Sequence, residues 1–373
     1  MRLLDRYLLR ELLLPFGYCL GGFLIFWVSS ELFKDMGELQ EKQMRPGDIV
    51  EYYLALSPGF LSIVLPVAFL LAILYALTQH ARNNEITAMR AAGLSLWRIA
   101  APYFVVGGLA SVTLLAINEL WAPDSEARAE FIKNRRAGGA TKFDPHLVRG
   151  MGLFNADANR HWVNGYYNSD TAEMISPLVV WTKPSGTKVM TAAARATRTN
   201  NVWVFFDVKQ YEFRALTGSG FVPTVQTNVL AIPEFNETAE EIRSEIRISQ
   251  HLTLKNRHRA DLPILVILDY LRLHPNLSRT DSAWLYTKLH SRLAGPWKCL
   301  VVVLIALPFG AASGRRNIFV GVASSILICF AYFVLLEISL AMGAAGKVPP
   351  WLAGWLPNIF FSVAGIWLTA RVR

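Results

Sequence analysis

The sequence predicts a polytopic α-helical membrane protein with six transmembrane helices and an inserted all-β, jelly-roll-like domain outside the membrane. Of its 373 residues, 53% are hydrophobic and only 17% are charged, whereas a soluble domain carries about 25% charged residues. Long apolar runs dominate the chain, and only the region around 143–254 departs from them, with short segments rich in β-branched and aromatic residues. Much of the chain therefore contacts lipid, and the middle region forms a separate domain.

Six apolar windows are long enough to cross a membrane. A helix rises about 1.5 Å per residue, so about 20 apolar residues span a hydrocarbon core roughly 30 Å thick. The windows are 12–33, 58–78, 99–121, 289–310, 318–342 and 351–370. The first follows a basic start, but it is too long for a signal peptide and lacks a small-residue cleavage site, so we expect it to remain as a span.

Arginine and lysine in the short loops predict the orientation, because these residues accumulate on the cytoplasmic side. With the N-terminus inside, the outer short loops hold four basic residues diluted by acidic ones: Lys34, Lys42, Arg45 and Lys347. The inner side collects Arg2, Arg6, Arg10, Arg82, Arg90, Arg98, Arg315, Arg316, Arg371 and Arg373. Both termini are therefore predicted to be cytoplasmic, and the insert to lie on the outer side.

The sequence of the insert predicts β-strands separated by turns. Short strand-like segments occur at 161–163, 178–181, 188–190 and 202–206, with breakers such as Pro184-Ser-Gly186 between them. A short amphipathic helix is predicted near 262–273. We expect three parts: 1–121 with spans one to three and an inner loop at 79–98, 122–288 with the β-domain and flanking helical segments, and 289–373 with spans four to six.

No sequence motif for catalysis or metal binding is found. The P-loop spacing that cradles nucleotide phosphates is missing, and the nearest string, Gly343-Ala-Ala-Gly-Lys347, has the wrong spacing. Cys19, Cys299 and Cys329 lie inside apolar segments, where neither a disulfide nor a metal site is expected. The basic residues punctuate apolar runs and form no patch for nucleic acid. We therefore expect no catalytic residue, metal or cofactor in this chain.

Several strings in chain order resemble the LptF/LptG permeases of the lipopolysaccharide exporter of Gram-negative bacteria. The resemblance covers nearly the whole chain, including the place of the insert, and the first and third strings resemble the G-type more than the F-type. The strings are Leu-Asp-Arg-Tyr-Leu at 4–8, Asn-Glu-Ile-Thr-Ala-Met-Arg-Ala-Ala-Gly at 84–93, Glu-Leu-Trp-Ala-Pro at 119–123, Arg-Leu-Ala-Gly-Pro at 292–296 with Leu-Pro-Phe at 307–309, and Trp-Leu-Pro-Asn at 355–358 after Pro349-Pro350.

The resemblance implies a function that composition alone does not supply. Two permeases of this family pair and bind a cytoplasmic ABC ATPase dimer, where ATP and Mg are held. The complex draws lipopolysaccharide from the outer leaflet of the inner membrane. It passes the lipid through periplasmic β-jellyroll domains to a periplasmic bridge protein. The missing P-loop agrees with hydrolysis in a separate subunit, and the β-domain would be periplasmic.

The inner loop at 83–93 is the candidate contact with the ATPase. Asn83 or Asn84 can cap a short helix, Glu85 lies in its first turn, and Gly93 can end it. Such a rod would present Glu85, Met89 and Arg90 to the cytosol. An ordinary capped turn between two spans is the alternative, and the resemblance favours coupling because the family's coupling helix falls on this string.

Charged residues near lipid are the candidates for a lateral gate. Placing a charge inside the membrane costs free energy, so such a residue is expected to interact with a partner. Glu31 and Lys34 lie at the outer end of the first span, and Glu337 lies about one turn inside the outer end of the fifth. The resemblance implies a gate between these spans, so Lys34 would alternately meet Glu337 and a lipid phosphate. Alternatively, Glu31 and Lys34 extend to the headgroups and Glu337 faces a polar group of another helix. Acidic Glu38 and Glu41 would weaken attraction for phosphate.

Apolar residues of the β-domain are candidates for a groove that holds acyl chains; the alternative is that they form the core of the domain. They are Leu178, Val180, Val202, Val204 and Phe206.

Three readings of the function follow. The leading one is a lipid-exporting permease subunit. In the second, the ATPase moves the outer domain to regulate a partner without transporting substrate, as in mechanotransmission. A membrane enzyme that uses Glu31, Glu119 or Glu337 ranks last, because the sequence pairs none of them with a second catalytic group.

Overall fold

The computed structural model describes residues 3–135, 147–155, 159–168, 171–182, 186–199, 201–213, 224–238, 240–245, 248, 262–275, 277–310 and 318–371. The chain divides into two compact units, a helical unit of Met1–Gly139 with Ser278–Arg373 and a β-rich unit of Ala140–Leu277. The β-rich unit is narrower than the predicted 122–288. The flanking helical segments at 122–134 and after Ser278 belong to the helical unit, because they pack on or continue its spans.

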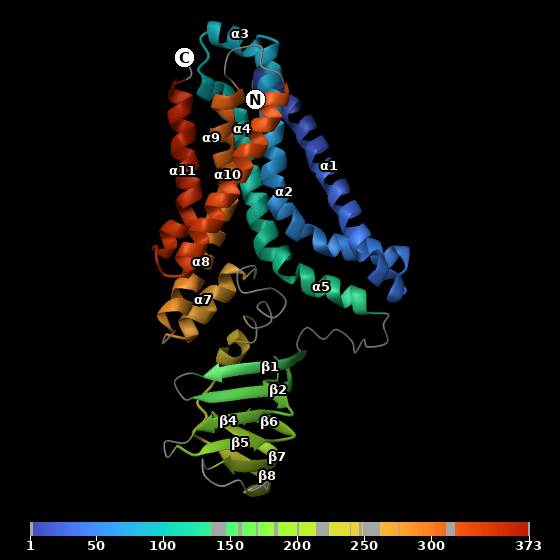
Figure 1. Cartoon of the computed structure of the whole chain (residues 1–373), viewed down its shortest axis with the longest axis vertical. Helices are drawn as coiled ribbons and strands as arrows, with labels where there is room; N and C mark the ends of the chain where they lie inside the picture. Colours follow the sequence, from blue (N-terminus) through green and yellow to red (C-terminus); the bar gives the residue numbers. More distant parts are fainter. Residues whose placement is uncertain are drawn as a thin grey trace. The chain divides into compact units, whose positions relative to one another are not determined.

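Six helices of the described chain are long and apolar enough to cross a membrane, as predicted (Figure 1). The fourth is built from α8, a short 3₁₀ segment η2 at Gly295–Trp297, and α9. Their bounds are α1 (Leu3–Glu41), α2 (Pro46–Arg82), α4 (Leu96–Ala116) with the π-helical η1 (Ile117–Trp121), α8 (Arg279–Ala294) with α9 (Lys298–Gly310), α10 (Ile318–Ala344) and α11 (Pro350–Arg371).

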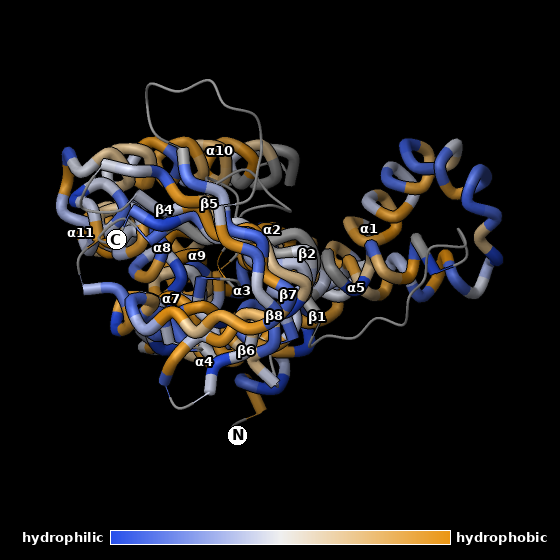
Figure 2. The backbone as a smooth tube through the Cα atoms, turned by 90° about the horizontal axis from the view of Figure 1, so that it is seen from below, coloured by the Kyte–Doolittle hydropathy of each residue, from blue (hydrophilic) through white to orange (hydrophobic). Residues whose placement is uncertain are grey.

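The two ends of the helical unit differ in what they carry. Helix α3 (Glu85–Ala91) joins α2 to α4 at the end where both chain termini lie (Figure 1). At the opposite end, α5 (Ala122–Asn134) continues the third span. Figure 2 shows hydrophilic residues gathered where α1 ends beside α5. We call these the α3 end and the α5 end.

Helix α2 forms the centre of the helical unit. It packs against α1, α5, α9 and α10, and its residues Phe69, Ile73 and Leu77 are fully buried. Helices α1 and α10 are the least buried of the six spans. Their exposed large apolar residues, such as Phe26 on α1 and Phe330 on α10, are suited to lipid or to another membrane protein.

The β-rich unit contains one antiparallel eight-stranded sheet among the described residues. Strands β3 and β4 pair with successive parts of β2, and β5 and β6 pair with successive parts of β7, so each couple acts as one long interrupted strand. The strands are β1 (Leu147–Asn155), β2 (Arg160–Asn168), β3 (Glu173–Ile175), β4 (Leu178–Thr182), β5 (Lys188–Ala192), β6 (Arg195–Thr199), β7 (Val202–Phe213) and β8 (Val225–Ile232). This confirms the predicted inserted all-β, jelly-roll-like domain.

Alternation along the strands separates the two faces of the sheet, since successive side chains point to opposite faces. Trp162, Val179, Trp203 and Phe205 are fully buried in one aromatic core. Asp207, in left-handed backbone at φ +52°, interrupts this alternation on β7, and Val208 rejoins the buried face. Helix α7 (Ile264–Leu273) forms where the amphipathic segment was predicted and buries Ile267.

Candidate coupling and lipid-contact sites

Helix α3 ends at a glycine as its sequence predicts, but its predicted N-terminal side-chain cap is not formed. Gly93 has a positive φ of 85°, and the N–H groups of Gly93 and Leu94 donate to the carbonyls of Arg90 and Met89. This is a Schellman motif, in which glycine avoids the steric cost of the left-handed conformation. Asn84 precedes the helix in left-handed backbone and makes no side-chain capping bond, so the predicted asparagine cap is wrong.

Glu85 turns toward α1 and α2, while 30% of its side-chain surface stays exposed. Its Oε2 accepts hydrogen bonds from Nδ1 of His80 at 2.6 Å and from the hydroxyl of Tyr7 at 3.0 Å. Its Oε1 accepts from Nδ2 of Asn83 at 3.3 Å. Burial by itself raises the pKa of Glu85, but these hydrogen bonds outweigh it and hold that pKa below its usual value.

Of the other predicted coupling residues, Asn84 and Gly93 are exposed, whereas Met89 and Arg90 are partly buried. Met89 packs against the main core of the helical unit, and Arg90 is half-buried. Ile86 of the same helix is buried in that core. The surface that α3 leaves open consists instead of small side chains and glycine, namely Thr87, Ala88, Ala91, Ala92 and Gly93. Sequence spacing alone did not distinguish the two faces, because the helix is only seven residues long.

The predicted gate residues do not form one cluster within the chain. Lys34 is paired with Glu31 on the same helix at 3.0 Å, and its side chain is 67% exposed. Helix α1 packs mainly on α2, whereas α10 packs on α2, α8 and α11. Glu337 is exposed on α10 and acts electrostatically on Lys298 of α9. The structure therefore brings Lys34 to Glu31 and leaves Glu337 on a different span.

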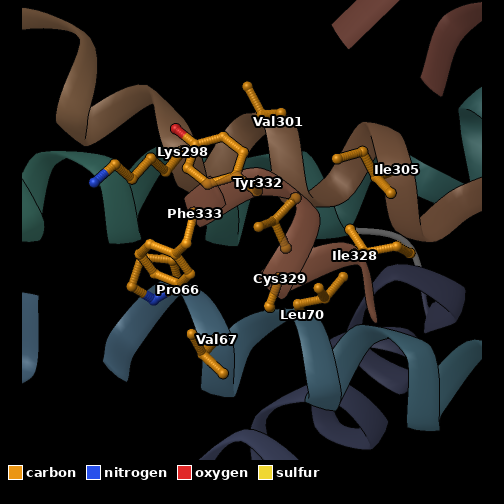
Figure 3. A pocket seen from close by; sticks show the side chains of 11 residues that line it. Pro66, Val67, Leu70, Lys298, Val301, Ile305, Ile328, Cys329, Tyr332 and Phe333 are labelled. Atoms are coloured by element: carbon orange, nitrogen blue, oxygen red, sulfur yellow. The ribbon is translucent and has the colours of Figure 1, made fainter. Parts of the chain in front are cut away.

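Lys298 borders an apolar hollow between α2, α9 and α10 that the sequence reading missed. The hollow is small, with a cavity volume of about 30 Å³. Figure 3 shows the lysine stem beside Tyr332 while its amino group points away from the lining. The charge of Lys298 inside a predicted span was a signal for this site. Because Lys298 lies within a long apolar run, the site was not predicted. The lining residues are Pro66, Val67, Leu70, Lys298, Val301, Val302, Ile305, Ile328, Cys329, Tyr332 and Phe333.

Charged side chains at the α5 end form ion pairs across helices. Lys133 of α5 bonds Glu38 of α1 at 2.5 Å, and Arg135 bonds Asp48 and Glu51 of α2. These partners are far apart in sequence, so no spacing rule predicted them. The hydrogen bond to Asp48 and the charge of Glu51 raise the pKa of Arg135. The pairs hold α5 against the first two spans and neutralise basic groups near the predicted lipid entry.

All five groove candidates of the β-domain lie on one face of the sheet, opposite the aromatic core. The burial pattern of β4 alternates, with Val179 and Trp181 buried between them, and on β7 the buried positions are Trp203 and Phe205. The candidates are half-buried and none is in the core cluster: Leu178, Val180, Val202, Val204 and Phe206. They lie outside this aromatic core, and a role in lipid contact stays a prediction.

The three carboxylates considered for a membrane enzyme lie on three different helical elements. Glu119 lies 3.9 Å from Arg292, Glu31 is paired with Lys34, and Glu337 is on another span. Among the residues that the structure describes, no group of three metal-binding side chains is found.

The chain matches a model of a known protein family. The family model described as lipopolysaccharide export system permease LptF/LptG matches residues 6–371, which is nearly the whole chain. No match to the chain is found among curated proteins. The match spans all six apolar helices and the inserted β-domain.

Proposed function

The chain belongs to the LptF/LptG family of lipopolysaccharide export permeases, and we propose that it is the membrane-embedded subunit of an ABC-type exporter driven by a separate ATPase. It is a multi-pass membrane protein and a transporter subunit rather than an enzyme. In this proposal it works in the bacterial inner membrane, extracts lipopolysaccharide from the outer leaflet and passes it to a periplasmic protein bridge.

The observation that carries this proposal is the short helix α3 at the end that holds both chain termini (Figure 1). Its outward face of alanine, threonine and glycine allows another protein surface to approach closely. Basic residues such as Arg82 and Arg98 flank it, which favours a cytoplasmic position for this end and for both termini. We infer that a cytoplasmic ABC ATPase dimer, which holds ATP and Mg, docks here.

Exposure of α1 and α10 supports a second permease of the same family as partner. These two spans are the least buried of the six, and they present Ile25 and Phe26 on α1 and Ile326 and Phe330 on α10. A gate between the first and fifth spans would then use α1 of one chain and α10 of the other. In that arrangement Lys34 would meet Glu337 of the partner permease or a lipid phosphate.

The half-buried face of the β-domain is the proposed path for acyl chains after extraction. Val204 and Phe206 on β7 share this face with Leu178 and Val180 on β4, while the opposite face is filled by the aromatic core. An apolar face that the domain does not cover with its own core suits contact with lipid. In the proposal the β-domain lies in the periplasm.

Co-purification from native membranes, with mass spectrometry of bound proteins and lipids, tests the proposal. Recovery of a P-loop ATPase, a second permease of similar length and a lipid A-containing glycolipid is the expected result. Recovery of the ATPase without glycolipid would favour mechanotransmission, in which the β-domain moves without carrying substrate. Recovery of neither would contradict the exporter assignment.

A further inference from the structure

We propose that Tyr7 and His80 are positioning residues that transmit movement of α3 to the first two spans through the carboxylate of Glu85. This proposal rests on the proposed role of α3 as the ATPase contact. It goes beyond that role because it identifies how a movement at α3 reaches α1, a span that is remote from α3 in sequence.

Three separate elements meet at one carboxylate. Tyr7 of α1 and His80 of α2 both bond Oε2 of Glu85, at 3.0 and 2.6 Å. The rings of Tyr7 and His80 also contact each other, with centroids 5.6 Å apart. Tyr7 and Glu85 are separated by 78 residues, so this bond joins α1 to α3 without help from chain connectivity. We call the three side chains the Tyr7–Glu85–His80 junction.

His80 fits a dedicated role in this junction. Its side chain is only 2% exposed, and a carboxylate on Nδ1 requires that this nitrogen carry the proton. Its Nε2 is buried and has no hydrogen-bond partner among the described residues. Burying such a nitrogen costs free energy that a hydrocarbon side chain would avoid. What the imidazole adds at this position is its hydrogen bond to Glu85.

A second bond fixes the rotation of α1. Oδ2 of Asp5 accepts a hydrogen bond from the guanidinium of Arg98 at 3.1 Å, which joins α1 to the start of α4. Residues two apart on a helix point about 200° away from each other, so Asp5 and Tyr7 hold opposite sides of α1. When α3 moves, α1 must follow at its α3 end or break one of these bonds. The junction therefore makes α1, the span with little other burial, the element that responds.

Tyr7→Phe tests the junction because it removes one hydroxyl and keeps the ring. The matched control is Tyr18→Phe, the same change on the same helix at a side chain that is 78% exposed. Both variants are assembled with the ATPase in nanodiscs, and ATP hydrolysis is measured with and without purified lipopolysaccharide. We expect Tyr7→Phe to bind the ATPase normally and to lose most of the lipid-stimulated increase, and Tyr18→Phe to retain it.

A distance measurement separates transmission from a purely structural role. Spin labels at Ser29→Cys on α1 and Val363→Cys on α11 report movement of α1 when the ATPase is trapped with ATP and vanadate. We expect a nucleotide-dependent shift that Tyr7→Phe reduces by at least half. An undiminished shift in Tyr7→Phe with the ATPase bound would overturn the junction alone. Failure of the unmodified chain to bind an ATPase would overturn the proposed function and the junction together.

Two substitutions of His80 provide an independent test if Tyr7→Phe folds poorly. His80→Asn keeps an N–H donor near the place of Nδ1, whereas His80→Leu keeps bulk and removes the donor. The junction predicts that the asparagine variant retains most of the lipid-stimulated hydrolysis and that the leucine variant loses it. Equal stimulation in the two variants would show that the hydrogen bond to Glu85 transmits nothing.

Discussion

The carboxylate of Asp48 near the start of α2 accepts a hydrogen bond from Arg135, which follows α5 and lies 87 residues away in sequence. Asp48 also accepts from the backbone N–H of Arg45 and so closes the first turn of α2. One buried carboxylate thus serves as a helix cap and as the attachment point of α5. The same end of α5 reaches α1 through Lys133 and Glu38.

We predict that Asp48→Asn loosens α5. The amide keeps a weaker capping bond but loses the charge that holds Arg135, so amide hydrogen exchange in α5 should accelerate several-fold. Hydrogen–deuterium exchange of the whole chain in nanodiscs measures this. Glu130→Gln, at an exposed site of α5, is the control and should leave exchange unchanged. Unaltered exchange in Asp48→Asn would mean that the ion pair does not hold α5.

Glu85 should give the helical unit an acid-sensitive stability. Its pKa is lowered in the folded protein, so its contribution is present above the ordinary pKa of about 4.3 and is lost as pH falls through the lower folded value. Thermal unfolding in detergent between pH 3 and 5 should therefore show a steeper loss for the unmodified chain than for Glu85→Gln. Parallel curves would contradict the hydrogen bonds to Glu85.

Lys34→Ala should affect lipid handling without affecting stability. The pair with Glu31 is on the surface, and such pairs contribute only about 0–1 kcal/mol. Melting temperature should stay nearly constant while lipid-stimulated ATP hydrolysis in the complex falls several-fold. Glu337→Gln on α10 is measured beside it. If each variant leaves stimulation unchanged, the gate assignment of these residues is wrong.

The sequence predicted the spans well because long apolar runs report directly on the cost of placing polar groups in lipid. It also located α3 and its glycine end, since both depend on neighbouring residues. It did not predict that Glu85 turns inward, because Tyr7 is 78 residues away. On β7, alternation revealed two faces but not which one is buried. The core is chosen by cross-strand neighbours such as Trp162, which contacts Trp203 with ring centroids 5.4 Å apart.

Helices α11 and α8 pack so closely at Gly354 that one added methyl group should destabilise the protein. A Cβ at Gly354 would lie 2.7 Å from the backbone carbonyl carbon of His290, and backbone atoms cannot move aside as a flexible side chain can. Gly354→Ala should cost about 1–3 kcal/mol through overpacking, measured as a lower melting temperature in detergent. Gly17→Ala is the control, because nothing lies within 4 Å of its Cβ position and alanine favours helix by about 1 kcal/mol. Equal stability of the two variants would contradict the α8–α11 contact.

The two faces of β7 should respond in opposite ways to substitution and to lipid. Trp203 is fully buried, and its indole N–H donates to the carbonyl of Glu237 at 2.9 Å, so Trp203→Ala should cost about 3–5 kcal/mol. Val204→Ala on the other face should cost about 1 kcal/mol or less, since its side chain is only half-buried. Urea unfolding of the whole chain, followed by hydrogen exchange in β7, measures both.

Crosslinkers at Val204 and at a more distant position of β7 test whether the half-buried face carries lipid. A photo-crosslinking residue at Val204 should capture lipopolysaccharide during ATP hydrolysis in the complex, and capture should fall when ATP is withheld. A crosslinker at Glu212, further along β7 on the other side of the interruption at Asp207, is the comparison. Because the aromatic core fills the face of Trp203, capture of acyl chains is expected on the side of Val204. Capture without dependence on ATP, or none at all, would remove the five half-buried residues from the lipid path.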